Sequence, residues 1–227
     1  MTSIPMASGP IASDPATGFV LAGGHSTRLG QDKVLLAWHG HTLLEDALDK
    51  LRAVCCEVRI CTNRLELGRY APVIPDAADS AGPLAGITAA LEVSTTAWNL
   101  FLPVDLPWMP VAFLAELLDR ARSGVALAVV PYLATMPQPL CAAYHRSLLP
   151  GLQQALIEGK HKVMLALEQA ASLPCGDCPG GFTTAIDRYP VDAPGHAAGN
   201  ADWFLNINTP EDLAQALLKR SNYSIRR

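Results

Sequence analysis

The sequence has no excess of basic residues, and this absence limits the partners that the protein can have. Its 227 residues include 17 Lys and Arg against 21 Asp and Glu, which gives a formal net charge of −4. A protein that binds nucleic acid through a broad face needs clustered cations to neutralise the phosphates. We therefore expect no nucleic-acid partner.

The amino-terminal residues 1–17 lack both a basic start and a continuous apolar run. We therefore expect neither a signal peptide nor a membrane span, and we predict a cytoplasmic protein with no membrane partner. The same segment is rich in Pro, Ser, Ala and Gly and shows no periodicity, so we interpret it as a flexible tail. Residues 18–220 are long enough for one substantial core and predict a single domain, with residues 221–227 as a second tail.

Closely spaced metal ligands are also scarce. The six histidines show no ligand spacing, and the C-x-x-C at Cys175–Cys178 has no second pair nearby. A structural zinc site needs four ligands, so this motif predicts a loop with two thiols, and a redox pair or half of a zinc site is the alternative. Cys55, Cys56, Cys61 and Cys141 fall in apolar runs, where we expect reduced thiols to serve as small core residues.

Two familiar glycine-rich signatures are missing as well. The glycine pair Gly23 and Gly24 is followed neither by the Gly-Lys-Ser/Thr ending of a P-loop nor by the third glycine of a dinucleotide fingerprint. Instead, the pair follows a short apolar strand and precedes two cations, Arg28 and Lys33. A strand that ends in Gly-Gly brings backbone N–H groups close to an anion, and the cations can neutralise a polyphosphate. The pattern therefore indicates phosphate binding.

Apolar runs alternate with amphipathic stretches along the rest of the chain. Because such alternation is the mark of a parallel sheet covered by helices, we predict an α/β fold. Strands are expected at residues 18–21, 58–61, 73–74, 99–104, 125–130, 140–144 and 204–207. Helices are expected at residues 43–54, 84–93, 110–122, 148–158 and 163–170, and a further helix is expected to start at the N-cap Thr209.

Three candidate binding residues follow predicted strands: Gly23, Asp76 and Asp105. In open α/β sheets the ligand lies beyond the carboxyl ends of the strands, so these residues are expected at one edge. The Asp105 carboxylate directly follows an apolar strand, and a rigidly held carboxylate can coordinate the Mg²⁺ of a nucleoside triphosphate. A helix cap or a turn is the alternative role for either aspartate.

One run of thirteen residues resembles a known signature: residues 21–33, LAGGHSTRLGQDK. It is similar to the nucleotide-binding signature of molybdenum cofactor guanylyltransferases, approximately L-A-G-G-x-S-x-R-M-G-x-D-K, with Leu29 in place of the methionine. Further segments follow in the family's order, namely Ile74–Asp76 with Gly82–Gly86, then Leu102–Pro107, Gly159–Met164 and Phe204–Leu213. The resemblance therefore runs from about residue 18 to about residue 218.

The resemblance implies a single Rossmann-like nucleotidyltransferase domain, with a mostly parallel sheet, one antiparallel strand and helices on both faces. It implies transfer of GMP from Mg·GTP to the terminal phosphate of molybdopterin, the molybdenum cofactor, with release of pyrophosphate and formation of molybdopterin guanine dinucleotide. Transient contacts with cofactor-delivery proteins or recipient molybdoenzymes are compatible with it. The alternatives are a related enzyme that uses CTP or another acceptor, such as a sugar or alditol phosphate, and a non-catalytic nucleotide-binding protein.

The resemblance also implies roles for single residues. Asp105 would hold the metal, and Lys33 and Arg28 would stabilise the charge that develops on the phosphates. The nucleotide would be bound by Leu21, Ala22, Gly23, Gly24, Lys33, Asp76, Gly82, Gly86 and Asp105.

Three asparagines complete the set. Asn63 is a partial match to a nucleotide-contacting residue, because Cys61 stands where the family's N-x-N-R pattern begins. Asn206 and Asn208 are two residues apart, so in a strand both would point to the same face. By resemblance they would lie on the acceptor side.

Overall fold

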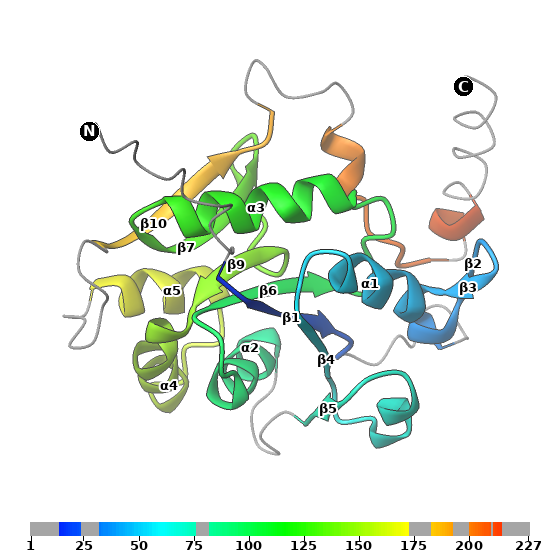
Figure 1. The fold of residues 1–227 in the computed structure, drawn as a ribbon, viewed down its shortest axis with the longest axis horizontal. Helices are drawn as coiled ribbons and strands as arrows, with labels where there is room; N and C mark the ends of the chain where they lie inside the picture. Colours follow the sequence, from blue (N-terminus) through cyan, green and yellow to red (C-terminus); the bar gives the residue numbers. More distant parts are fainter. Residues whose placement is uncertain are drawn as a thin grey trace, which may run out of the picture.

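The computed structural model describes residues 14–23, 32–75, 82–172, 183–192, 200–209 and 211–214. In this part of the chain, eight strands form one sheet in the order β10-β7-β9-β6-β1-β4-β5, with β8 paired to β7 off this path (Figure 1). The strands are β1 (Ala16–Leu21), β4 (Glu57–Cys61), β5 (Val73–Ile74), β6 (Trp98–Pro103), β7 (Ala126–Leu133), β8 (Met136–Pro137), β9 (Ala142–His145) and β10 (Thr183–Pro190).

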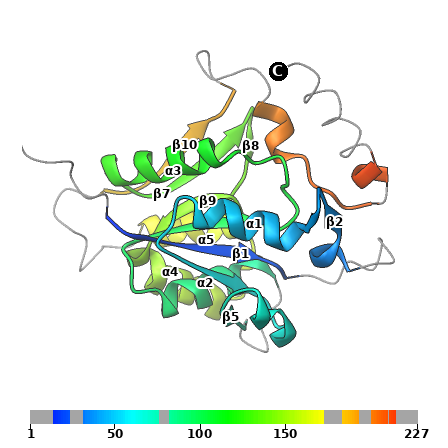
Figure 2. The same ribbon diagram turned by 45° about the vertical axis from the view of Figure 1, so that its right-hand side comes forward.

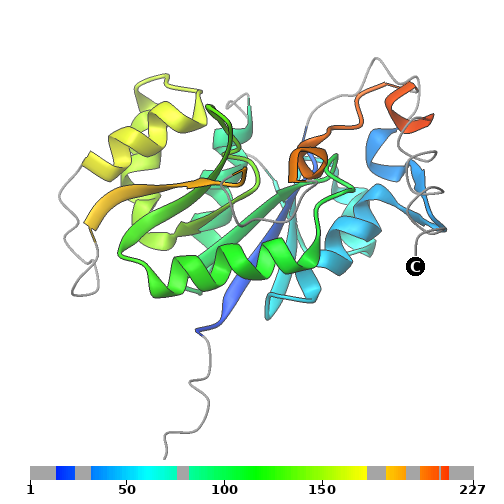
Figure 3. The ribbon, with the colours of Figure 1, turned by 90° about the horizontal axis from the view of Figure 1, so that it is seen from above.

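Most of the sheet is parallel. Strand β1 is parallel to both β4 and β6, β4 is parallel to β5, and β7 is parallel to β10. Strand β9 runs antiparallel between β6 and β7, and the short β8 is antiparallel to β7. The predicted α/β fold with a mostly parallel sheet and an inserted antiparallel strand is confirmed, and β8 is an addition to it. Figure 3 shows β1, in blue, near the middle of the sheet.

Five α-helices cover the two faces of the sheet. Helices α1 (Leu43–Arg52) and α3 (Val111–Ser123) lie on one face, and α2 (Pro83–Val93), α4 (Leu149–Ile157) and α5 (Val163–Ser172) lie on the other (Figure 2). All five match predicted helices within a few residues. The described residues also form short 3-10 helices and a small hairpin: η1 (Lys33–Leu35), η2 (Leu65–Arg69), η3 (Arg146–Leu148), η4 (Asn200–Phe204), β2 (Ala37–Trp38) and β3 (His41–Thr42).

The central strands bury side chains on both faces, which explains their continuous apolar sequence. On β1, Val20 packs into the core under α1 and α3, whereas Phe19 packs into the core on the α2 side. The Phe19 ring stacks on the Phe101 ring of β6, with 5.2 Å between the ring centroids. Because side chains alternate along a strand, one apolar run supplies both cores.

Local sequence signals determine where α1 begins. The Thr42 hydroxyl accepts a hydrogen bond from Glu45 N at 3.2 Å, and the Glu45 carboxylate accepts one from Thr42 N at 2.7 Å. This capping box satisfies two backbone donors that the first turn of a helix leaves unpaired. The preceding β2–β3 turn has positive φ at both His39 (49°) and Gly40 (90°), the conformation that a two-residue hairpin requires.

The predicted strand at residues 204–207 is wrong. The chain instead forms η4, which ends at Phe204, and then runs irregularly to residue 209. Phe204 and Ile207 are both buried, and Phe113 of α3 packs against the Phe204 ring, so the apolar pattern reflects burial and not strand pairing. None of the described strands pairs with this segment. The predicted N-cap Thr209 is confirmed, since its hydroxyl accepts from Asp212 N at 3.1 Å and residues 211–214 are helical.

Besides the two short strands of the β2–β3 hairpin, two strands of the large sheet were not predicted. Strand β10 follows a stretch rich in Pro and Gly, although its Thr183, Thr184 and Ile186 are the β-branched residues typical of strands. Strand β8 has only two residues. The core role expected for the thiols holds for Cys61 and Cys141, which are both buried, but Cys56 is exposed. None of the described helices has the length and apolar character of a membrane span.

Candidate functional site

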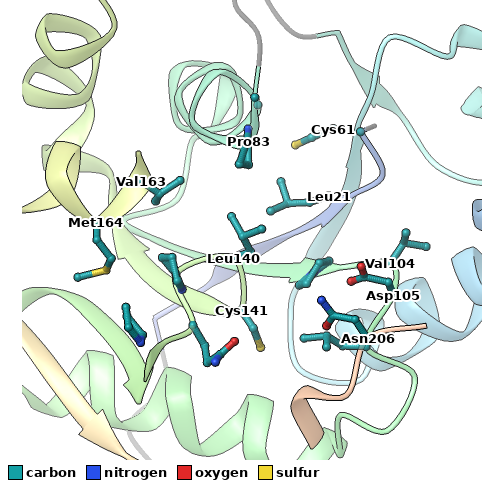
Figure 4. A pocket seen from close by; sticks show the side chains of 18 of the residues that line it. Leu21, Cys61, Pro83, Val104, Asp105, Leu140, Cys141, Val163, Met164 and Asn206 are labelled. Carbon is teal, nitrogen blue, oxygen red and sulfur yellow. The ribbon is translucent and has the colours of Figure 1, made fainter. Parts of the chain in front are cut away.

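A cavity of about 770 Å³ opens at the carboxyl ends of the central strands (Figure 4). Strand β1 lies between β4 and β6, so the order of the strands reverses here, and such a switch point is where open α/β sheets bind ligands. The lining residues that follow these strands are Leu21, Gly23, Cys61, Pro103, Val104, Asp105 and Leu106.

The cavity has two chemically different ends. One, the charged end, consists of Lys33, Asp105 and Asn206, and Figure 4 shows Asp105 and Asn206 close together. The other, the apolar end, consists of Leu140, Val163 and Met164, which come from the β8–β9 connection and the start of α5. Other residues from these segments also line the cavity: Met136, Pro137, Gln138, Pro139, Cys141, His161 and Lys162.

Lys33 connects the elements of the charged end. Its Nζ donates to Asp105 Oδ2 at 2.8 Å and to Asn208 Oδ1 at 2.7 Å. The Lys33 and Asp105 side chains are only 15% and 19% exposed, so this ion pair is partly shielded from water. Residues far apart in the sequence therefore meet at one cation, and that cation faces the cavity.

Backbone hydrogen bonds hold Asp105 and Asn208 in place. Val104 N donates to Leu21 O at 3.1 Å, which extends the β1–β6 ladder to the residue before Asp105. Ile207 N donates to Asp105 O at 3.1 Å, and this bond attaches the carboxyl-terminal segment to the end of β6. Asn206 and Asn208 flank that bond, so both asparagines reach the site although the strand predicted to carry them does not form.

Two glycines form the wall next to α2. Gly82 precedes the helix with φ of +111°, a conformation that strongly favours glycine, and Gly86 lies in the first turns of α2. Both line the cavity, as does Pro83 between them in Figure 4. Gly82 and Gly86, which the sequence predicts to bind the nucleotide, therefore lie together at the cavity.

Other predicted residues do not reach the cavity or cannot be placed. Ala22 is buried, and its N–H is used in a hydrogen bond to Cys61 O at 3.1 Å. Asn63 is exposed and is not among the residues that line the cavity. Gly24, Arg28 and Asp76 lie outside the described residues, as do Cys175 and Cys178.

The apolar end was not predicted, although one of its segments, Gly159–Met164, had been singled out by resemblance. A sequence signal for the other segment is the Pro137-Gln138-Pro139 run, which restricts the backbone on both sides of a polar side chain. Burial raises the pKa of the Cys141 thiol to about 12, so this cysteine is a protonated wall residue at neutral pH and not a nucleophile.

The donor set suits a metal that arrives with a nucleotide. Among the described residues, no group of three or more His, Cys, Asp and Glu side chains could hold a metal ion. Asp105 is the one acidic side chain in the described lining of the cavity. Mg²⁺ is commonly bound by one or two carboxylates together with substrate phosphates and water, so a single carboxylate fits Mg²⁺ on a nucleoside triphosphate.

Comparisons with known proteins agree with this geometry. Residues 18–172 match the family model described as MobA-like NTP transferase domain. The chain is 32% identical over 212 residues to the probable molybdenum cofactor guanylyltransferase of Bacillus cereus (strain AH820), and the match covers 90% of this chain and 97% of that protein.

Solved structures show the same fold. The molybdopterin-guanine dinucleotide biosynthesis protein A of Archaeoglobus fulgidus has a TM-score of 0.72 and 25% identity, with 91% of this chain and 99% of that chain covered. The 2-C-methyl-D-erythritol 4-phosphate cytidylyltransferase of Thermus thermophilus has a TM-score of 0.58 and 19% identity, with 88% and 98% covered. The second likeness concerns the fold alone.

Proposed function

The chain belongs to the MobA-like NTP transferase family and is a nucleotidyltransferase, and from this premise we propose that it transfers GMP from Mg·GTP to the terminal phosphate of molybdopterin. Pyrophosphate and molybdopterin guanine dinucleotide are the products. The observation that carries the proposal is the contact of Lys33 with Asp105 and Asn208 at the switch point of the sheet. A single cation there lies between a metal-binding carboxylate and an acceptor-side amide.

In the reaction, an oxygen of the acceptor phosphate bonds to the α-phosphorus, and the bond from that phosphorus to the pyrophosphate oxygen breaks. The attacking oxygen is already anionic, so no general base is needed. When bound, Mg²⁺ neutralises phosphate charge. Asp105 would hold the metal, and Lys33 would stabilise the negative charge that develops at the α-phosphate. Arg28, by resemblance, grips the outer phosphates as a fork.

Lys33 and Asp105 form an ion pair, with 2.8 Å between Lys33 Nζ and Asp105 Oδ2. Each partner neutralises the other while the site is without substrate, which avoids an uncompensated charge in a partly buried position. A metal-bound triphosphate offers each partner a new opposite charge, so Lys33 can exchange the carboxylate for phosphate oxygens. The ion pair therefore keeps both groups ready for the nucleotide.

The nucleotide base is bound beside Gly82 and Gly86, where no side chain at these two positions blocks approach to the backbone. Leu21, Gly23, Gly24 and Asp76 complete this binding region in the proposal. Molybdopterin occupies the space between Asn206 and the apolar end, where Lys162 can pair with acceptor charge and Gln138 can form hydrogen bonds.

The test is a panel of GTP, CTP and ATP, each supplied with Mg²⁺ and molybdopterin, with pyrophosphate release as the readout. GTP should exceed CTP and ATP by well over tenfold in kcat/KM, because a wrong base leaves buried polar groups unpaired at about 1–3 kcal/mol each. Lys33→Ala is the matched inactive control. Preference for CTP would reject the guanylyl assignment, and nucleotide binding without turnover on any acceptor would reject transfer.

A further inference from the structure

The segment Thr62–Arg64, which follows β4, holds both ends of the connection between β1 and η1. At the β1 end, the Thr62 hydroxyl donates to Ala22 O at 3.2 Å. At the η1 end, the guanidinium of Arg64 donates to both carboxylate oxygens of Asp32, at 2.7 and 2.5 Å. The segment Thr62–Arg64 thus contacts both Ala22, which follows β1, and Asp32, which precedes η1.

The holding segment is itself fixed to the sheet. Thr62 N donates to Ile74 O of β5 at 3.0 Å, and Arg64 N donates to the Thr62 hydroxyl at 3.3 Å. The Arg64 guanidinium is oriented by a third contact, from its Nε to Glu66 Oε1 at 2.8 Å. These hydrogen bonds fix the backbone and the guanidinium of Arg64, the residue that contacts Asp32.

Asp32 in turn determines the path of the backbone at Lys33. It is the N-cap of η1, where its Oδ1 accepts from Val34 N at 3.2 Å and its carbonyl accepts from Leu35 N at 3.0 Å. The hydrogen bond from Arg64 lowers the pKa of the Asp32 carboxyl below its ordinary value, so the cap is ionised at neutral pH. Lys33 lies directly between the cap and the residue that is capped.

The other side of Lys33 is anchored by packing. Val34 and Leu36 are buried in the core under α1, and Leu43 N donates to Leu36 O at 3.0 Å. At the amino-terminal side of η1, the Lys33 side chain reaches Asp105 and Asn208. The Arg64 contact adds a second tie, from Asp32 just before Lys33 to the segment after β4, across 32 residues of sequence.

We propose that Arg64 is a positioning residue, which grips Asp32 and thereby holds Lys33 in place against Asp105 and beside the end of β1. This inference rests on the proposed function only where turnover is the readout. Of the pair Asn63-Arg64, which follows β4, Asn63 is exposed and does not line the cavity. The proposal gives Arg64 a role at the site that Asn63 does not have. Arg64 acts through Asp32 and does not itself line the cavity.

A purely structural ion pair would behave differently. The Arg64 and Asp32 side chains are 32% and 34% exposed, and pairs of this kind contribute little to the stability of the fold. Loss of the grip should therefore move Lys33 and lower turnover while the melting temperature hardly changes. A structural role would show the reverse, a lower melting temperature with an unchanged Lys33.

The first experiment needs no substrate. Amine modification of the full-length protein is followed residue by residue by mass spectrometry in Arg64→Leu, Asp32→Asn and the double variant. Asn can still cap Val34 N but cannot form the charged fork. Arg69→Leu is the matched control, because Arg69 ends η2, the short helix that Arg64 precedes, and its guanidinium hydrogen-bonds to Tyr70 and stacks on the Tyr70 ring. We expect Lys33 to react several times faster in all three variants, with Lys160 and Lys162 unchanged.

The second experiment measures turnover of the same variants. We expect Arg64→Leu to lower kcat about tenfold or more with KM for the nucleotide within a few-fold, because a displacement of about 1 Å is costly for catalysis. Arg64→Lys should recover part of the loss, since an ammonium cannot form both arms of the fork. The double variant should be no worse than the poorer single variant.

The outcomes separate this inference from the proposed function. Equal Lys33 reactivity in Arg64→Leu and Arg69→Leu would overturn the positioning role, as would a double variant whose loss is the product of the single losses. If the parent protein transfers no GMP, the proposed function fails, and the Lys33 reactivity still decides whether Arg64 positions it.

Discussion

The charged end of the cavity and its apolar end are built from different parts of the sheet. The charged end follows the parallel strands β1 and β6, and hydrogen bonds from η1 and the carboxyl-terminal segment cross-link it. The apolar end comes from the connection that precedes the antiparallel β9 and from the start of α5. At the apolar end the walls are mostly side chains of apolar residues, with Gln138, His161 and Lys162 as polar exceptions.

This difference suggests that phosphate binding and acceptor recognition depend on different parts of the sheet. Parallel strand ends hold charged groups rigidly at fixed places, which suits the phosphates common to all nucleoside triphosphates. An antiparallel insertion can change length and sequence without disturbing those strands, which suits recognition of one acceptor among many. The comparison predicts that changes at the charged end lower kcat and that changes at the apolar end raise KM for the acceptor.

The largest effect should come from Asp105→Asn. The amide keeps the shape of the side chain but loses the charge that a hard cation prefers, so Mg²⁺-dependent turnover should be abolished while the fold stays intact. A titration of activity with Mg²⁺, combined with circular dichroism, measures both. An unchanged rate and an unchanged Mg²⁺ requirement would show that Asp105 does not bind the metal.

A somewhat smaller loss is expected for Lys33→Ala. Its charge is needed most where charge develops, and loss of one such contact costs about 2.7–4 kcal/mol in the barrier, on the order of a hundredfold or more in rate. Binding of Mg·GTP, measured by calorimetry, should weaken far less than kcat falls. A kcat within a few-fold of the parent would remove Lys33 from the mechanism.

At the apolar end, Lys162→Ala should raise KM for the acceptor about tenfold and leave KM for the nucleotide unchanged, since loss of one charge-assisted hydrogen bond costs roughly 1.5 kcal/mol. Lys160→Ala is the matched control, because Lys160 is occupied by Glu158 and Gln169 and does not line the cavity. Steady-state kinetics with each substrate varied in turn gives both constants. A rise in the nucleotide KM instead would contradict the division into two ends.

The smallest effect concerns His145, which is buried at the end of β9, opposite Trp98 at the start of β6. It therefore lies at the other end of the strands from the cavity. Burial lowers the pKa of its imidazole, so as the pH falls, this histidine is protonated at a higher pH in the unfolded chain than in the native protein. Its contribution to stability is therefore complete above about pH 6.5 and is lost as the pH falls below that value, by at most about 1.4 kcal/mol per pH unit.

Urea unfolding at pH 7 and pH 5 compares the parent with His145→Gln. The variant should lose less stability between the two pH values, and its turnover at pH 7 should match that of the parent, because His145 lies away from the cavity. An equal loss in both proteins would show that His145 does not contribute to the acid sensitivity.

Sequence periodicity predicted the parallel half of the sheet well. The runs that became β1 and β6 are short and almost wholly apolar, β4 alternates apolar residues with Glu57 and Arg59, and α1 carries an amphipathic pattern with the Thr42–Glu45 capping box. These signals lie within a few residues of each other, so they can be recognised without knowing the fold. Strand β10 and the false strand at residues 204–207 are the counterexamples, because pairing partners and burial there come from distant residues.

The sequence by itself determined the α/β class, the glycine-rich end of β1, and the position of Asp105 two residues beyond β6, since each depends on neighbouring residues. Only the tertiary structure decided that Lys33 meets Asp105 and Asn208, that Asn63 is exposed and does not line the cavity, and that the β8–β9 connection forms the second wall of the cavity. Those contacts join residues 72 and 175 positions apart, and no local pattern encodes them. They form because the packed sheet brings the ends of its strands to one edge.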